Sequence, residues 1–118
     1  METKKGEGIV KLRKIKPNKN NEYQLNVNTI NVISGKAGIL YLPYVETLSQ
    51  LQVIFTEKGE FTIDGNGVNI HLGMTNCPRI EINPGSPTFD TIPMFVYSDE
   101  KWFVLTLGNI IIPDEVTP

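Results

Sequence analysis

Apolar and polar side chains alternate along much of the chain, which is the pattern of β-strands with one buried face. The alternation is clear from Tyr23 to Val27, and it returns in two short runs, 61–63 and 68–72. A change of phase near Asn28–Thr29 indicates a β-bulge. With similar runs elsewhere, the pattern predicts about eight to ten short strands.

Two turns are expected to join strands into hairpins. The first lies at Asp64–Gly67, because its Asp-Gly and Asn-Gly pairs supply the positive φ angles of a tight turn. The second lies at Ser98–Lys101 and joins 94–98 to 102–107. Its return strand is apolar on both faces, so we expect both faces to be covered. Around the first turn, we expect buried side chains from Phe61, Ile63, Val68 and Ile70.

The composition favours strands over helices. The sequence holds 14 Ile, 9 Val and 10 Thr but a single alanine, Ala37, and β-branched residues suit strands whereas alanine is the best helix former. Residues 46–50 fit either one helical turn or a loop. The predicted fold is all-β, a compact antiparallel β-sandwich or barrel-like body. A solenoid-like stack has similar strand spacing, but no repeat is firm enough to choose it.

Charge is divided unevenly along the chain. Residues 1–20 hold seven Lys or Arg and two Glu, a balance of +5, whereas residues 21–118 hold four against eleven, a balance of −7. We therefore expect an extended basic attachment arm over 1–20, a β-sandwich body over 21–113 and a short polar tail over 114–118. Residues 9–15 fit either a short strand or an arm that becomes extended on docking. The arm residues expected to bind a partner are Lys4, Lys5, Ile9, Val10, Lys11, Leu12, Arg13, Lys14, Ile15 and Lys16.

Three roles are open for this basic segment. It can be a solvated tail, it can dock on an acidic protein surface, or it can bind phosphates of a nucleic acid. The first aromatic residue is Tyr23, so the segment lacks the interleaved aromatics of single-strand binders. Nucleic acid is therefore the least favoured partner.

Residues with catalytic or metal-binding chemistry are sparse. His71 and Cys77 are the only histidine and cysteine, too few for a structural zinc site, and they are better read as a surface strand residue and a small buried one than as a nucleophilic pair. The segment 64–67 lacks the later Gly and Glu of a calcium loop. The adjacent carboxylates at 99–100 and 114–115 point to opposite faces on a strand. We expect no enzyme activity, metal or cofactor.

No segment is apolar enough to cross a bilayer, and the first residues contain no apolar signal region. With one cysteine, the chain cannot form an intrachain disulfide. We expect the protein to be made and kept, or assembled, in a cytosol, without a membrane partner.

Part of the sequence resembles a module of tailed-bacteriophage virion proteins found in fibres, spikes and capsid accessory proteins. The resemblance covers Gly38–Asn109, about 70 residues, and its motifs are turn-and-strand patterns at 39–43, 58–67 and 95–102. It implies an all-β fold, homotrimeric assembly and a structural or adsorption role, and it implies no catalytic residues. The chain differs from a long fibre in having no repeats and no coiled-coil stalk.

The expected function is that of a structural virion protein, assembled in the host bacterial cytoplasm. It would decorate or attach to the capsid as a homotrimer, with its arm on the major capsid protein or another virion protein. The alternative is a carbohydrate- or receptor-binding β module of a fibre or cell surface, with a host glycan on a platform of Tyr41, Tyr44, Tyr97 or Trp102. The expected subunit interface comprises Trp102, Phe103, Leu105, Ile110, Ile111 and Ile112.

Overall fold

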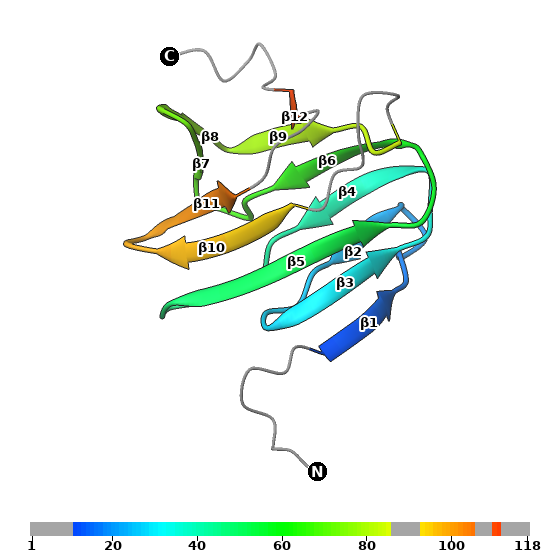
Figure 1. Ribbon diagram of the computed structural model, residues 1–118, viewed down its shortest axis with the longest axis horizontal. Helices are drawn as coiled ribbons and strands as arrows, with labels where there is room; N and C mark the ends of the chain where they lie inside the picture. The colour runs from blue at the N-terminus through cyan, green and yellow to red at the C-terminus, as the bar shows by residue number, and fades with distance from the viewer. Residues whose placement is uncertain (1–10, 86–92, 106–109, 112–118) are drawn as a thin grey trace.

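The computed structural model describes residues 11–85, 93–105 and 110–111, and every regular element among them is a strand. The strands form a seven-stranded sheet, here sheet A, in the order β1-β3-β5-β10-β11-β7-β8, and a five-stranded sheet, sheet B, in the order β12-β9-β6-β4-β2 (Figure 1). The all-β prediction is confirmed. The strands are β1 (Lys11–Ile15), β2 (Glu22–Gln24), β3 (Thr29–Ile33), β4 (Ala37–Tyr41), β5 (Ser49–Phe55), β6 (Glu60–Asp64), β7 (Ile70–Leu72), β8 (Thr75–Cys77), β9 (Arg79–Ile82), β10 (Met94–Ser98), β11 (Lys101–Leu105) and β12 (Ile110–Ile111).

The first six strands wind between the two sheets like coils of a solenoid. Odd-numbered strands of this set lie in sheet A and even-numbered ones in sheet B, so each strand is followed by one in the opposite layer. As a result β1, β3 and β5 run parallel, and so do β2, β4 and β6. The expectation of antiparallel pairing is wrong for the pairs that these six strands make with one another and for the β7–β11 pair. It holds for all pairs made by β8, β9, β10 and β12.

The coils differ in length, which explains why the sequence shows no firm repeat. In sheet A, Lys11 lies beside Thr29, 18 residues later, whereas Ile30 lies beside Gln52, 22 residues later. A repeat is visible in a sequence only when equivalent positions recur at a constant interval. The loops between coils absorb the difference here.

The core lies between the sheets and is built from the inward side of both. The ring centroids of Phe55 in sheet A and Phe61 in sheet B lie 4.9 Å apart. Around them pack fully buried aliphatic side chains of sheet A and sheet B, which alternate with outward-facing residues. They include Ile33, Leu40, Leu51, Val53, Ile63, Ile70, Ile80 and Ile82.

The turn at Asp64–Gly67 forms a corner between the sheets and not a hairpin. Its local chemistry is as expected: Asn66 and Gly67 have positive φ angles of 59° and 95°, and the Asn66 N–H donates to the Asp64 carboxylate at 2.7 Å. However, β6 pairs with β4 and β9, while β7 pairs with β8 and β11. The expected burial of Phe61, Ile63 and Ile70 is confirmed, and Val68 is half-buried against the core.

A second corner replaces the expected bulge near Asn28–Thr29. The chain leaves sheet B after β2, turns at residues 27–28 and enters sheet A as β3. Asn28 takes a positive φ of 52° there. The shift in alternation is therefore caused by the passage of the chain from sheet B to sheet A. Of residues 46–50, for which a helical turn or a loop was expected, 46–48 form a loop and 49–50 begin β5.

The β10–β11 hairpin is confirmed. Met94 to Ser98 pair antiparallel with Leu105 to Lys101, and the two turn residues, Asp99 and Glu100, have φ angles of 56° and 65°. Two successive positive φ angles match the right-handed twist of the flanking strands.

Residues 11–15 belong to the sandwich. They form β1, which pairs with β3 along its whole length, so the domain boundary expected at residue 20 lies inside the sheet structure. The Pro17–Asn21 segment is an ordered turn in which the Asn18 side chain accepts hydrogen bonds from the N–H groups of Asn20 and Glu22 at 2.8 and 3.0 Å. In the part of the chain that the structure describes, no helix is long and apolar enough to span a membrane.

Candidate binding surfaces

The outer face of sheet A carries a row of apolar side chains. Because directly paired residues share a face of the sheet, the register places one residue from each of five strands side by side: Leu12, Ile30, Gln52, Met94 and Leu105. Ile30, Gln52, Met94 and Leu105 alternate with residues of the core and therefore point away from sheet B, and Leu12 shares their face through its pairing with Ile30. Leu12 is 67% exposed and Leu105 is 56% exposed. Four of the five side chains are apolar, so this row is a candidate contact surface.

A second row lies beside the first on the same outer face. It runs from Gln50 through Val96 and Phe103 to His71, and the His71 and Phe103 rings pack at 5.2 Å. Val96 and Phe103 are half-buried. The two rows together form what we call the outer A face, a surface with glutamines but no carboxylates among its row residues.

The residues expected at a subunit interface do not form one surface. Phe103 and Leu105 lie on the outer A face, but Trp102 points into the core, is 0% exposed and packs on Tyr97 at 5.4 Å between ring centroids. Its inclusion was wrong because alternation places neighbours on a strand on opposite faces. Ile110 and Ile111 form β12 at an edge of sheet B. Ile112 lies outside the described residues, as do Lys4, Lys5, Ile9 and Val10.

Basic residues gather at the edge of sheet A. Lys11, Arg13 and Lys14 are exposed on β1, and Lys16 follows the strand. Ile15 is half-buried and packs against the core, beside Ile33. The predicted cationic segment is therefore held on a strand at the rim of the sandwich.

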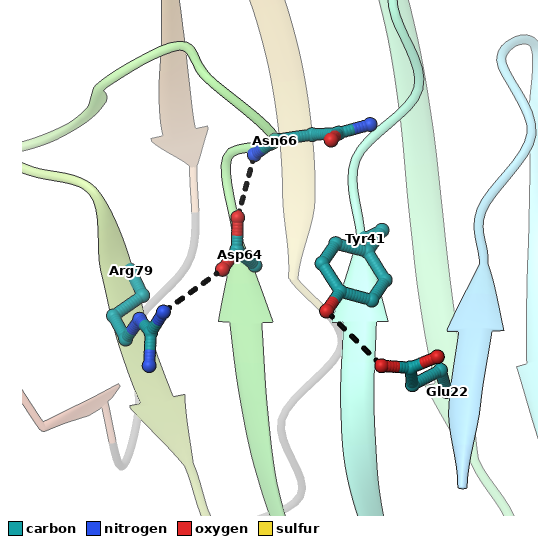
Figure 2. A network of polar contacts seen from close by, with 5 residues as sticks. All are labelled: Glu22, Tyr41, Asp64, Asn66 and Arg79. Carbon is teal, nitrogen blue, oxygen red and sulfur yellow. Dashed lines mark hydrogen bonds and ion pairs between the residues drawn. The ribbon is translucent and has the colours of Figure 1, made fainter. Parts of the chain in front are cut away.

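The outer face of sheet B is polar and charged. Arg79 contacts Asp64 at 3.3 Å, and the Tyr41 hydroxyl donates to Glu22 at 3.4 Å, so that four neighbouring strands each contribute one side chain (Figure 2). Burial and the nearby Glu22 and Asp64 carboxylates raise the pKa of Tyr41 above its usual value. The raised pKa favours the protonated phenol, which is the form that donates the hydrogen bond to Glu22.

A groove of about 450 Å³ crosses this face beside the network. It lies over β4, β6 and β9, and short or polar side chains form much of its lining. The lining residues are Gly38, Ile39, Glu60, Phe61, Thr62, Glu81 and Asn83. In register, Thr62 lies between Ile39 and Glu81.

The four aromatic residues considered as a ligand platform separate into two pairs. Tyr97 and Trp102 are core residues. Tyr41 is half-buried on the outer face of sheet B, and Tyr44 is exposed and donates a hydrogen bond to Glu46 at 2.8 Å. Only Tyr41 and Tyr44 can therefore contact a ligand.

His71 and Cys77 do not form a nucleophilic pair. His71 lies on the outer A face with its Nδ1 2.8 Å from the Asn76 side-chain oxygen, whereas Cys77 is paired with Ile70 and is fully buried on the inner side. Burial raises the pKa of the Cys77 thiol and so disfavours the reactive thiolate. Within residues 11–85, 93–105 and 110–111, no three His, Cys, Asp or Glu side chains cluster as metal ligands would.

Compared with known proteins, the chain matches no protein-family model and no curated protein sequence.

Sequence reasoning missed most of the outer A face. The side chains of Ile30, Met94 and Val96 point to the outer face of sheet A, whereas the core residues of the same strands point inward. The signal in the sequence is the presence of apolar residues on both faces of 94–97, the same pattern as in the return strand at 102–107. Because the partner strands come from distant parts of the sequence, the rows become visible only with the register.

Proposed function

We propose that the protein is a structural component of a tailed-bacteriophage virion and decorates or attaches to the capsid as a homotrimer. The observation that carries the proposal is the outer A face, where apolar side chains from β1, β3, β10 and β11 lie in register across five strands. Contiguous exposed apolar patches on a protein surface mark interaction sites. The resemblance of Gly38–Asn109 to virion modules supports the trimer and the virion as its setting.

The rest of the molecule supports a structural role over catalysis. The single histidine and the single cysteine of the sequence, His71 and Cys77, lie on opposite sides of sheet A. The body is a two-layer sandwich with a core of aliphatic and aromatic side chains, and the backbone edge of the basic strand β1, unpaired among the described strands, offers a further place for attachment. Self-association through one face leaves that edge free for a larger structural protein.

The trimer is tested by the mass of the full-length chain in solution. We expect light scattering at micromolar concentration to give about three times the 13.2 kDa chain mass, and we expect Leu105→Asp to give the monomer mass, because a buried unpaired carboxylate opposes association. Met74→Asp is the matched control, since Met74 is 97% exposed in the turn between β7 and β8. A monomeric wild-type chain, or a trimer unaffected by Leu105→Asp, would contradict the proposal.

The virion setting is tested independently by the flanking genes. Neighbouring genes for a major capsid protein or a portal would support it, and neighbours confined to cellular metabolism would count against it.

A second candidate function, saccharide binding, is favoured by the groove on sheet B. Tyr41 lies beside the groove but is not one of its lining residues; it pairs with Asp64, whose carboxylate contacts Arg79. Aromatic faces with adjacent polar groups suit a pyranose ring, which has an apolar face and a rim of hydroxyls. Tyr44, by contrast, lies in the loop after β4.

We expect Tyr41→Ala to reduce binding to an array of bacterial surface polysaccharides at least tenfold, and Tyr44→Ala to leave it unchanged. Loss of a stacked ring removes its buried apolar area and, besides that, up to about 1.5 kcal/mol of ring contact energy, and a tenfold loss of affinity corresponds to about 1.4 kcal/mol. Wild-type protein that binds no saccharide on the array would remove this candidate.

A further inference from the structure

Within residues 11–85, 93–105 and 110–111, strand β1 is the longest of the four strands that end the two sheets. Sheet A ends in β1 and β8, and sheet B ends in β12 and β2. β1 has five residues, whereas β2 and β8 have three each and β12 has two. Short edge strands offer few unpaired backbone groups to another chain. β1 is therefore the edge with most room for an added strand.

One side of β1 is paired and the other is not paired with any strand in the described part of the chain. Its five residues lie beside Thr29–Ile33 of β3 in parallel register. Lys11 to Lys14 are exposed, so no described element covers them. The backbone N–H and C=O groups on the far side of an edge strand can bond an extended segment.

The side chains of β1 oppose pairing with a second copy of itself. Lys11 and Arg13 share the inward face with the buried Thr29 and Asn31, and Leu12 and Lys14 share the outer face with Ile30 and Val32. Cations thus project from both faces. Two such strands side by side would place like charges opposite each other, which is destabilising, and inward-pointing charges are a known protection of open edges.

The same charges favour an acidic strand. A segment with alternating carboxylates would place acidic side chains next to Lys11 and Arg13 on one face, or next to Lys14 on the other. Lys16 and Lys19 extend the positive charge beyond the strand. Leu12, 67% exposed, offers an apolar contact between the basic residues of β1. Backbone hydrogen bonds then supply affinity, and charge supplies the choice of partner and the encounter rate.

We propose that β1 is a strand-addition site: an extended acidic segment of a larger structural protein pairs with its open edge and enlarges sheet A by one strand. This site specifies how the protein would be attached. The identity of the partner as a virion protein rests on the proposed function. In this arrangement the partner supplies the added strand and this chain supplies the edge.

The test uses the full-length protein and a blocked peptide of alternating glutamate and valine, long enough to span β1. We expect the peptide to bind and to slow amide hydrogen exchange on β1. We expect the Lys11→Glu, Arg13→Glu, Lys14→Glu triple variant to lose affinity at least tenfold. The control variant Lys58→Glu, Lys101→Glu changes charge away from this edge and should bind as the wild type does.

Two further peptides separate strand addition from simple charge attraction. A lysine–valine peptide should not bind, and an acidic peptide of equal charge with prolines at alternate positions should lose binding, because proline lacks the N–H that a ladder needs. Equal binding of the proline peptide, or no change in exchange on β1, would overturn the proposal. The Leu105→Asp variant should still bind the glutamate–valine peptide, so that failure of the trimer and failure of the edge site give different results.

Discussion

Replacing Asn31 by leucine is expected to lower the free energy of unfolding by about 2–4 kcal/mol. Asn31 is 0% exposed, and its side chain holds the corner between β2 and β3. Its Nδ2 group donates to the carbonyl oxygens of Asn26, Thr29 and Gln52 at 3.0–3.1 Å, and its Oδ1 accepts from the Asn26 N–H at 2.9 Å. Leucine has a similar volume but satisfies none of these backbone groups.

The cost arises from backbone groups that lose their partner inside the protein. A buried donor or acceptor left without a hydrogen bond costs about 1–3 kcal/mol, and Asn26 would lose partners for both its N–H and its C=O. The measurement is urea unfolding followed by the fluorescence of Trp102, the one tryptophan, at a fixed protein concentration because association shifts apparent stability. Asn69→Leu, at an exposed position, is the control and should change stability by less than about 0.5 kcal/mol. A loss below about 1 kcal/mol for Asn31→Leu would show that water replaces the amide.

The sequence predicted well those features that depend on residues close together in the chain. The β10–β11 hairpin is an example, since its two strands are joined by two residues, Asp99 and Glu100, that adopt positive φ angles. The turn at Asp64–Gly67 was also located correctly. Turn chemistry fixes the local path of the backbone. That local path predicts strand pairing only where the two strands joined by the turn are also neighbours in one sheet, as β10 and β11 are.

Pairing between distant segments could not be predicted in the same way. Asp-Gly-Asn-Gly reverses the chain equally well into a hairpin or into the opposite sheet, and the outcome here depends on Ile70 pairing with Trp102, 32 residues later. The pairing of Leu12 with Ile30 likewise joins residues that are far apart in the sequence. Alternation identifies the two faces of each strand, but it does not identify the neighbour. For that reason the inward side of the sandwich was predicted better than the outer A face.

Within the arm expected over residues 1–20, residues 11–15 form a strand, the alternative left open for 9–15, and the reason why composition alone did not decide between the two is physical. Exposed cations dominate Lys11–Lys16, and such composition is typical of a solvated segment. An edge strand, however, has solvent beside it and, at the end of the sandwich, on much of both faces, so its side chains need little apolar character. Ile15, packed against the core, and the paired backbone keep this segment in the sheet.

The substitution Gly65→Ala is expected to destabilise the protein by about 3 kcal/mol, near the upper end of the cost of overpacking. Gly65 lies at the corner where the chain passes from β6 in sheet B to β7 in sheet A. A Cβ atom there would overlap the carbonyl oxygen of Val68, and its next neighbour is the Val68 carbonyl carbon at 3.0 Å. Both atoms belong to the backbone, so no side-chain rotation relieves the overlap.

The corner cannot widen freely, because hydrogen bonds close it on both sides. The Gly65 N–H donates to the Pro78 carbonyl oxygen at 2.9 Å, and the Gly65 carbonyl oxygen accepts from the Val68 N–H at 3.2 Å. Widening the turn therefore strains or breaks these bonds and displaces Ile70 from its place beside Trp102. We expect urea unfolding of Gly65→Ala to have a lower midpoint, with Trp102 emission in the native state shifted towards longer wavelength as its packing loosens. Gly73→Asn is the control: Gly73 has a φ of 63° with open space around it, and asparagine tolerates that conformation. If the two variants proved equally stable, the close approach at Val68 would not constrain the corner.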